Sequence, residues 1–92
     1  MFKIRAGYML RRIVDEWVVV SYGEGAARAQ SFMLLNETGA MLWQMMQTGA
    51  DVRGMAQALI DEYGLDAPRA HADAAAFAAR LVADGIAIPS AD

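Results

Sequence analysis

The side chains that could do chemistry in this sequence are few, because the chain contains one histidine, His71, and no cysteine. A histidine acts as a general base when a partner group orients it inside a pocket. His71 instead falls in the first turns of an alanine-rich stretch, beside its apolar residues. The serines have no neighbouring histidine, and His71 alone would have to serve them all. We therefore interpret His71 as a surface residue and predict a protein without catalytic residues.

The carboxylates and glycines form no metal or phosphate site that spacing alone would reveal. Asp15 and Glu16 fall in a predicted turn. Asp61 and Glu62 fall on the outer face of a predicted helix, where each is most simply a solvated charge. Residues 23–25, Gly-Glu-Gly, resemble the start of a phosphate-binding loop, but no third glycine or lysine follows at the required place. We predict neither a metal ion nor a cofactor.

Length, charge and hydropathy narrow the classes of protein to which the chain could belong. Its 92 residues have the length of one domain, which we assign to residues 1–92. A net charge of −3 argues against nucleic acid, because nucleic-acid binders usually carry a basic excess that neutralises phosphates. We expect no signal peptide, and no stretch approaches the roughly 20 apolar residues of a membrane span. With cysteine absent, these features predict a cytoplasmic protein without a membrane partner.

Three short runs rich in β-forming residues predict strands in the first third of the chain, at residues 8–14, 17–22 and 31–35. Asp15 and Glu16 separate the first two runs at the length of a hairpin loop. This pair lacks the glycine or asparagine that such turns favour. Residues 23–30 are small, polar and rich in glycine and alanine, so we expect a loop there.

Three helices are predicted after these strands, each opened by a residue whose side-chain oxygen can accept the first free backbone N–H groups. These capping residues are Asn36, Asp51 and Asp66. A glycine is expected to end each helix, at Gly49, Gly64 and Gly85. Helical spacing gives the third helix an apolar face of Ala70, Ala74, Phe77, Ala78, Leu81 and Val82. Met45, Met46 and Met55 recur at helical spacing as well, and we interpret them as core.

The predicted order of elements is therefore β-β-β-α-α-α. It indicates an α+β fold in which a three-stranded antiparallel N-terminal sheet is followed by three helices. Two helices joined by a tight turn beside a small sheet predict an arrangement like that of a winged helix-turn-helix domain.

The segment between the third strand and the first helix resembles a family signature. It reads Leu35-Asn36-Glu37-Thr38-Gly39-Ala40, followed by Leu42-Trp43. This looks like the Leu-Asn-x-Thr-Gly-Ala segment of PqqD-like proteins, which closes on an aliphatic residue and a tryptophan. The family's third helix and closing turn are matched by Asp73, Phe77, Leu81, Gly85 and Ile86. The resemblance spans nearly the whole chain, roughly residues 9–88. It is based on the order and spacing of these motifs taken together.

The resemblance implies a recognition element for precursor peptides, with a fold similar to winged helix-turn-helix domains. Such proteins bind the leader of a ribosomally made peptide and deliver it to a tailoring enzyme, often a radical SAM protein. The family places the leader along the third strand and against the third helix. In this sequence that strand supplies Ser31, Phe32, Met33, Leu34 and Leu35. The helix face away from the core should supply Arg69, Asp73, Ala76 and Arg80, at spacings of four, three and four.

The physics of a small sheet agrees with this role. Each edge strand has unpaired N–H and C=O groups, to which an extended peptide can add a strand. The same edge permits a dimer as readily as a monomer. Arg69 and Asp73 have a simpler interpretation as well, since an i, i+4 surface ion pair needs no ligand to explain it.

Three other functions stay open on the sequence. A winged-helix nucleic-acid binder would present several basic or amide side chains on its third helix, whereas here Arg69 and Arg80 are balanced by Asp73 and Asp84. A regulatory subunit would bind its enzyme directly, with the peptide secondary. A small enzyme is disfavoured by the missing catalytic constellation. The precursor peptide, the partner enzyme and the product are not specified by these residues.

Overall fold

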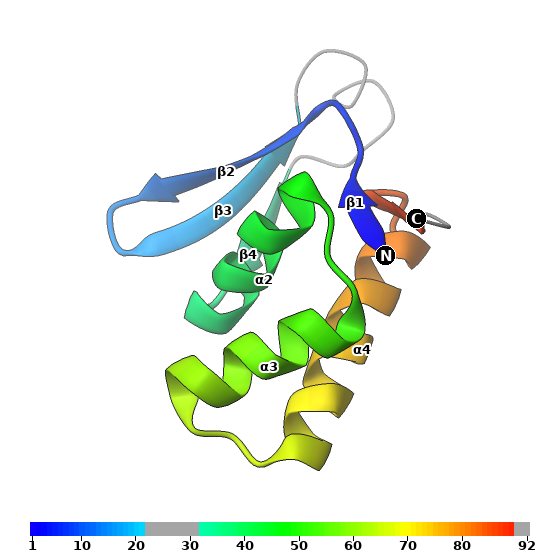
Figure 1. The fold of residues 1–92 in the computed structure, drawn as a ribbon. Coiled ribbons are helices and arrows are strands. Elements are labelled where there is room, and N and C mark those ends of the chain that lie inside the picture. Colours follow the sequence, from blue (N-terminus) through cyan, green and yellow to red (C-terminus); the bar gives the residue numbers. More distant parts are fainter. Residues whose placement is uncertain (22–31, 90–92) are drawn as a thin grey trace.

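The predicted three-stranded sheet is confirmed by the computed structural model, which describes residues 1–21 and 32–89. Its antiparallel strands are β2 (Tyr8–Ile13), β3 (Glu16–Ser21) and β4 (Phe32–Leu35), in the order β2-β3-β4 (Figure 1). β3 is therefore central, and β2 and β4 are the two edges. The predicted loop at 23–30, with Tyr22 and Ser31, lies outside the described residues.

The β2–β3 hairpin turns one residue earlier than predicted. Ile13 pairs with Glu16, so the two loop residues are Val14 and Asp15 rather than Asp15 and Glu16. Val14 has a φ of 57°, the only positive φ of a non-glycine residue in the described part of the chain. A positive φ at the first loop residue alone is the pattern of a type II′ turn, where glycine is usual. The prediction failed because a β-branched residue rarely takes this conformation.

Replacing Val14 by glycine is expected to stabilise the protein. A non-glycine residue held at positive φ costs about 1–3 kcal/mol, and the extra freedom of glycine in the unfolded chain returns about 0.5–1 kcal/mol. The Val14 side chain is 86% exposed, so its removal loses little packing. We expect a gain of about 1 kcal/mol, which thermal unfolding would register as a Tm higher by about 4–8 °C. A lower Tm in Val14→Gly than in the wild type would contradict the strain at this turn.

Three helices follow the sheet, as predicted: α2 (Glu37–Thr48), α3 (Val52–Tyr63) and α4 (Ala67–Ala83). The Asp51 side chain accepts the N–H of Gly54 at 2.7 Å, which caps α3. Asp66 precedes α4 in extended conformation without a side-chain capping bond. The C-caps of α2 and α3 are Gly49 and Gly64, which both have positive φ, as predicted. The C-cap of α4 is instead Asp84, and the predicted Gly85, also at positive φ, follows it directly.

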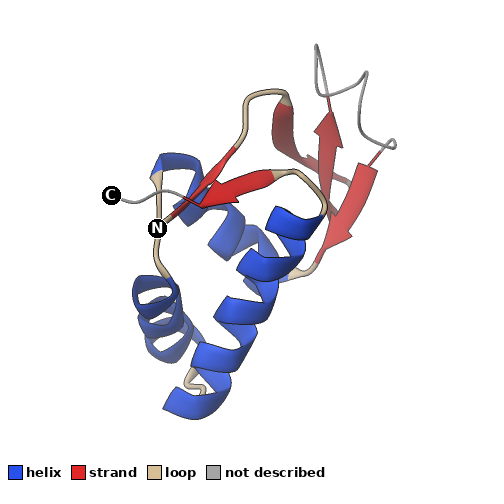
Figure 2. Ribbon diagram, turned by 90° about the vertical axis from the view of Figure 1, so that its right-hand side faces the viewer, coloured by secondary structure: helices blue, strands red, loops and turns tan. Residues whose placement is uncertain are grey.

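A second, two-stranded sheet joins the ends of the chain, and the sequence did not reveal it. β1 (Phe2–Ile4) pairs antiparallel with β5 (Ala87–Pro89), so segments far apart in the sequence lie side by side (Figure 2). Phe2 also exchanges two backbone hydrogen bonds with Ala50, of 2.6 and 3.0 Å, just before α3. These contacts hold the first residues against the helices.

The core lies between the sheet and the helices, with α3 packed along α4. Its largest fully buried side chains are Trp43, Met46, Met55, Leu59 and Leu81. Ala70, Ala74 and Ala78 of α4 are also fully buried, and their small side chains let α3 approach closely. Met46 and Met55 are core residues as predicted, whereas Met45 is only partly buried. Phe77 and Val82, predicted on the same apolar face, lie at its margins.

Candidate functional site

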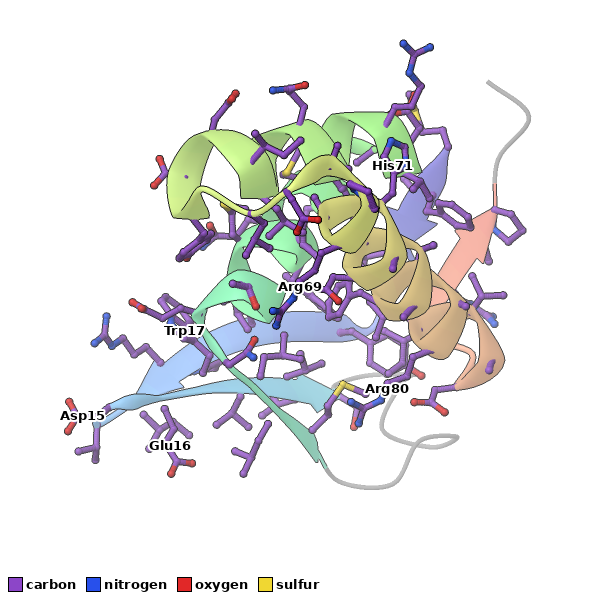
Figure 3. The ribbon with its side chains drawn as sticks, turned by 90° about the horizontal axis from the view of Figure 1, so that it is seen from below. Asp15, Glu16, Trp17, Arg69, His71 and Arg80 are labelled. Atoms are coloured by element: carbon purple, nitrogen blue, oxygen red, sulfur yellow. The ribbon has the colours of Figure 1, made fainter. Side chains whose placement is uncertain are left out.

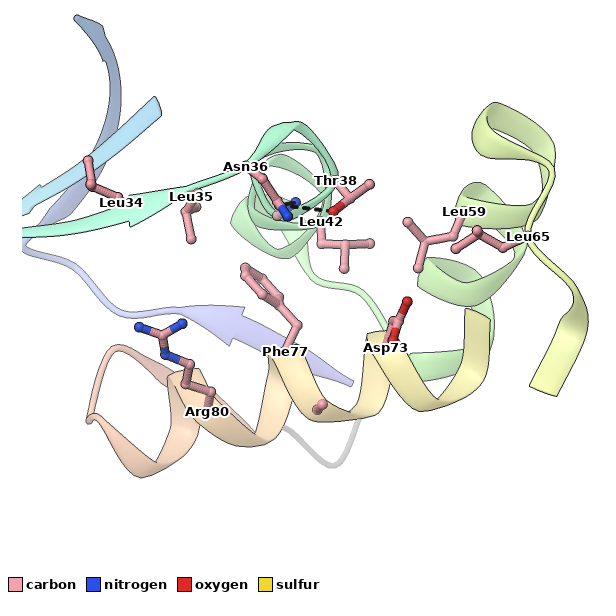
Figure 4. A pocket seen from close by; sticks show the side chains of 12 residues that line it. Leu34, Leu35, Asn36, Thr38, Leu42, Leu59, Leu65, Asp73, Phe77 and Arg80 are labelled. Atoms are coloured by element: carbon pink, nitrogen blue, oxygen red, sulfur yellow. Dashed lines mark hydrogen bonds between the residues drawn. The ribbon is translucent and has the colours of Figure 1, made fainter. Parts of the chain in front are cut away.

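A groove of about 420 Å³ runs between β4 and α4, with the start of α2 and the end of α3 closing its other sides (Figure 4). β4 contributes Leu34 and Leu35, and α4 contributes Asp73, Ala76, Phe77 and Arg80. The remaining lining residues are Asn36, Thr38, Gly39, Leu42, Leu59 and Leu65. The groove therefore combines an apolar floor with charged groups on its α4 side.

The edge of β4 gives this groove a row of backbone groups. Within residues 1–21 and 32–89, β4 pairs with β3 alone, so its second edge has no strand partner. Val18 pairs with Leu34 and Val19 with Met33, so successive β4 side chains face opposite sides of the sheet. Leu34 is 55% exposed, whereas Met33 is partly buried against the core. An extended ligand could pair with this edge without disturbing the core.

The turn from β4 into α2 is fixed by the signature segment. The N–H of Gly39 donates to Asn36 Oδ1 at 2.8 Å, and the Thr38 hydroxyl donates to the same oxygen at 2.9 Å. A Cβ added at Gly39 would lie 3.1 Å from Asn36 Oδ1 and 3.4 Å from Leu35 Cβ. The segment is thus a helix cap with a close approach of backbone to strand. It sets the angle at which β4 meets the groove.

The α4 side of the groove carries two opposite charges separated by an aromatic ring. Asp73 and Arg80 point into the groove on either side of Phe77 (Figure 4). Each charge also has an i, i+4 partner on α4: Arg69 Nε lies 3.6 Å from Asp73 Oδ2, and Arg80 Nε lies 3.8 Å from Asp84 Oδ2. All four side chains are about half exposed or more, and ion pairs at such exposed positions contribute little to the stability of the fold.

The nine residues predicted to bind peptide fall into three groups. Leu34, Leu35, Asp73, Ala76 and Arg80 line the groove together. Phe32 and Met33 belong to β4, and Met33 is not among the lining residues, while Arg69 lies a turn beyond Asp73 on α4. Ser31 lies outside the described residues. Seven lining residues were not predicted to bind peptide: Asn36, Thr38 and Gly39 of the capping segment, the helix residues Leu42, Leu59 and Phe77, and Leu65.

A second hollow, of about 530 Å³, lies on the outer face of the sheet. Its walls are mainly the apolar side chains Ile13, Val14, Val18, Val20 and Leu34, with Asp15 and Glu16 at the hairpin tip. It offers a ligand the middle of a sheet face, without the unpaired backbone that a strand edge provides. The groove is therefore the stronger candidate site.

Within residues 1–21 and 32–89, the groups that could catalyse a reaction lie apart from one another. His71 is exposed on α4, while Asp15 and Glu16 lie at the tip of the β2–β3 hairpin on the other side of the molecule (Figure 3). In the described part of the chain, no three His, Asp or Glu side chains are grouped as metal ligands would be. None of the described helices combines the length and apolar character needed to cross a membrane.

The family model described as coenzyme PQQ synthesis protein D (PqqD) matches residues 16–87. No curated protein sequence gives a significant match. Two solved structures are similar over almost their full length. One is a lasso peptide synthetase B1 complexed with the leader peptide: 26% identity, TM-score 0.76, covering 96% of this chain and 98% of that one. The other is TbiB1 in complex with the TbiA(beta) leader peptide: 23% identity, TM-score 0.75, covering 98% and 99%.

Proposed function

The chain belongs to the PqqD family, and from this premise we propose that it is a non-catalytic peptide-binding protein of the cytoplasm. It captures the leader of a ribosomally synthesised precursor peptide by β-strand addition. It then delivers the peptide to a modifying enzyme, for which the resemblance to PqqD-like proteins favours a radical SAM protein. No cofactor of its own takes part in this role.

The observation that carries the proposal is the groove between the unpaired edge of β4 and the exposed face of α4. The lasso peptide synthetase B1 that shares the fold at 26% identity was solved with a leader peptide bound. Five residues predicted from the sequence for peptide binding converge on this groove in the present chain. The shape of the groove and the membership of the PqqD family thus both support a leader peptide as the ligand.

Strand addition suits the chemistry of the groove. The backbone edge of β4 can supply hydrogen bonds that are independent of the peptide's sequence. Side chains of an added strand alternate, so every second residue would face α4. There they would meet Phe77, Leu42 and the small side chain of Ala76, which leaves room for a bulky apolar residue. Backbone pairing would thus supply affinity, and the apolar floor would supply selectivity.

The experiment that tests the proposal is an amide NMR titration with candidate leader peptides encoded beside this gene. We expect saturable shifts along β4 and along α4 from Arg69 to Arg80, at micromolar affinity or better. Binding of a neighbouring enzyme or of a DNA duplex, with no response to any local peptide, would instead favour the regulatory subunit or the nucleic-acid binder.

Reversing the charge of Arg80 is expected to weaken the binding of an acidic leader. Arg80 is exposed and lines the groove, so Arg80→Glu replaces an attraction by a repulsion at little cost to the fold. We expect a three- to fivefold higher Kd at low salt, converging with the wild type as salt screens the charges. Fluorescence anisotropy with labelled leaders measures this. Arg53→Glu, an exposed change outside the groove on α3, is the control. Equal Kd values for several acidic leaders would make Arg80 an ordinary surface residue.

A further inference from the structure

The two charges of the groove lie at defined places along α4, and together they give it a polarity. Asp73 and Arg80 are seven residues apart, which is a rise of about 10 Å along a helix. Arg80 lies at the end of the groove beside Leu34 and Leu35, where β4 is present (Figure 4). Asp73 lies at the other end, toward Leu59 and Leu65, beyond the point where β4 has ended.

Neither Asp73 nor Arg80 forms a hydrogen bond with its ion-pair partner on α4. The nitrogen-to-oxygen distances of 3.6 Å for Arg69 and Asp73 and 3.8 Å for Arg80 and Asp84 are too long for hydrogen bonds. The side chains of Asp73 and Arg80 are 52% and 61% exposed. A bound peptide could therefore exchange or share these partners without breaking a buried contact.

The direction of an added strand sets the order in which it meets the two charges. The sheet is antiparallel throughout, and antiparallel pairing is the more stable per residue, so we take the peptide to run antiparallel to β4. β4 runs toward Asn36, so the peptide enters past Asp73 and then passes Arg80. Residues i, i+2 and i+4 of a strand share one face and span about 13 Å. This span exceeds the rise of about 10 Å between Asp73 and Arg80 along α4. The long side chain of Arg80 can reach across the difference.

From this geometry we propose that the groove selects leaders by charge order: a basic residue at i, an apolar residue at i+2 and an acidic residue at i+4. The basic residue meets Asp73, the apolar residue packs on Phe77 and the acidic residue meets Arg80. This rule rests on the proposed function and adds the class of leader that the groove takes. It makes Asp73 and Arg80 specificity-determining residues that act as a pair.

The test uses three synthetic peptides that share one strand-forming sequence. One carries Lys at i and Glu at i+4, the second carries them in reversed order, and the third carries Gln at both places. Each is titrated against the wild type and against Asp73→Arg/Arg80→Asp, a double variant that conserves net charge. The neutral peptide reports whether the groove of the variant is intact.

We expect the wild type to bind the Lys-first peptide about tenfold more tightly than the Glu-first peptide, because two attractions replace two repulsions. The double variant should show the opposite preference, and both preferences should shrink at high salt. Equal affinity for all three peptides would overturn the charge rule while leaving leader binding standing. Binding of an encoded leader but of none of the three would overturn it as well. If the encoded leaders themselves did not bind, that result would instead count against the proposed function.

Discussion

Replacing Ala76 by tryptophan is expected to weaken leader binding by at least about 100-fold while leaving the fold intact. Ala76 is exposed on α4 and lines the groove, beside Phe77. An indole at this position would occupy the space that a peptide side chain needs, so binding would have to displace it. Since the residue contacts solvent rather than core, the free energy of unfolding should change by no more than about 0.5 kcal/mol.

Ala75→Trp is the matched control for this prediction. Ala75 is also exposed on α4, but it lies outside the groove, so its substitution should leave the Kd unchanged. Isothermal calorimetry with an encoded leader measures both variants, and thermal unfolding verifies that both are folded. If Ala76→Trp bound the leader as tightly as Ala75→Trp, the peptide would have to dock somewhere other than this groove.

Replacing Leu34 by proline is expected to raise the Kd for a leader by about 50-fold. Proline has no N–H and fixes φ, so it disrupts the ladder of an edge strand. Leaving a hydrogen-bonding group of the peptide without its partner costs about 1–3 kcal/mol, and the distorted edge adds to this. Leu34 is 55% exposed, and prolines are tolerated on edge strands, so the variant should still fold.

A change in the peptide separates loss of strand addition from damage to the sheet. Backbone N-methylation at alternate residues of the leader should abolish binding in one register and be tolerated in the other, because only alternate amides point at β4. The wild-type protein is used for this scan, so its fold is not in question. A folded Leu34→Pro with unchanged affinity, or an N-methyl scan without alternation, would rule out pairing with β4.

Much of the fold could be predicted because its signals are local. Asn36, Asp51 and the glycines that follow α2 and α3 are caps, and a cap is set by a few neighbouring residues. The β1–β5 pair was missed for the opposite reason. Each strand has three residues, too few to show periodicity, and the partners lie at opposite ends of the chain.

The site was predicted in part: residues that share one helix face could be found from their spacing, whereas residues brought in by the packing of helices could not. The spacing of Asp73, Ala76 and Arg80 places them on one helix face, and that face does line the groove. Phe77 satisfies the core pattern equally well, so the sequence could not show that it also reaches the groove. Nothing in the sequence marks Leu59 and Leu65 as groove residues, because their place in the groove depends on how α3 meets α4.

The sequence by itself determined the order of β2, β3, β4 and the three helices, the caps at both ends of α2 and α3, and the absence of cysteine chemistry, since all of these follow from residue type and short-range spacing. The tertiary structure decided the rest. Only strand pairing makes β4 an edge, and only the packing of α4 across from it forms a groove with Arg80 at one end and Asp73 at the other. Such features join residues far apart in the chain, and local preferences carry no information about which distant partners will meet.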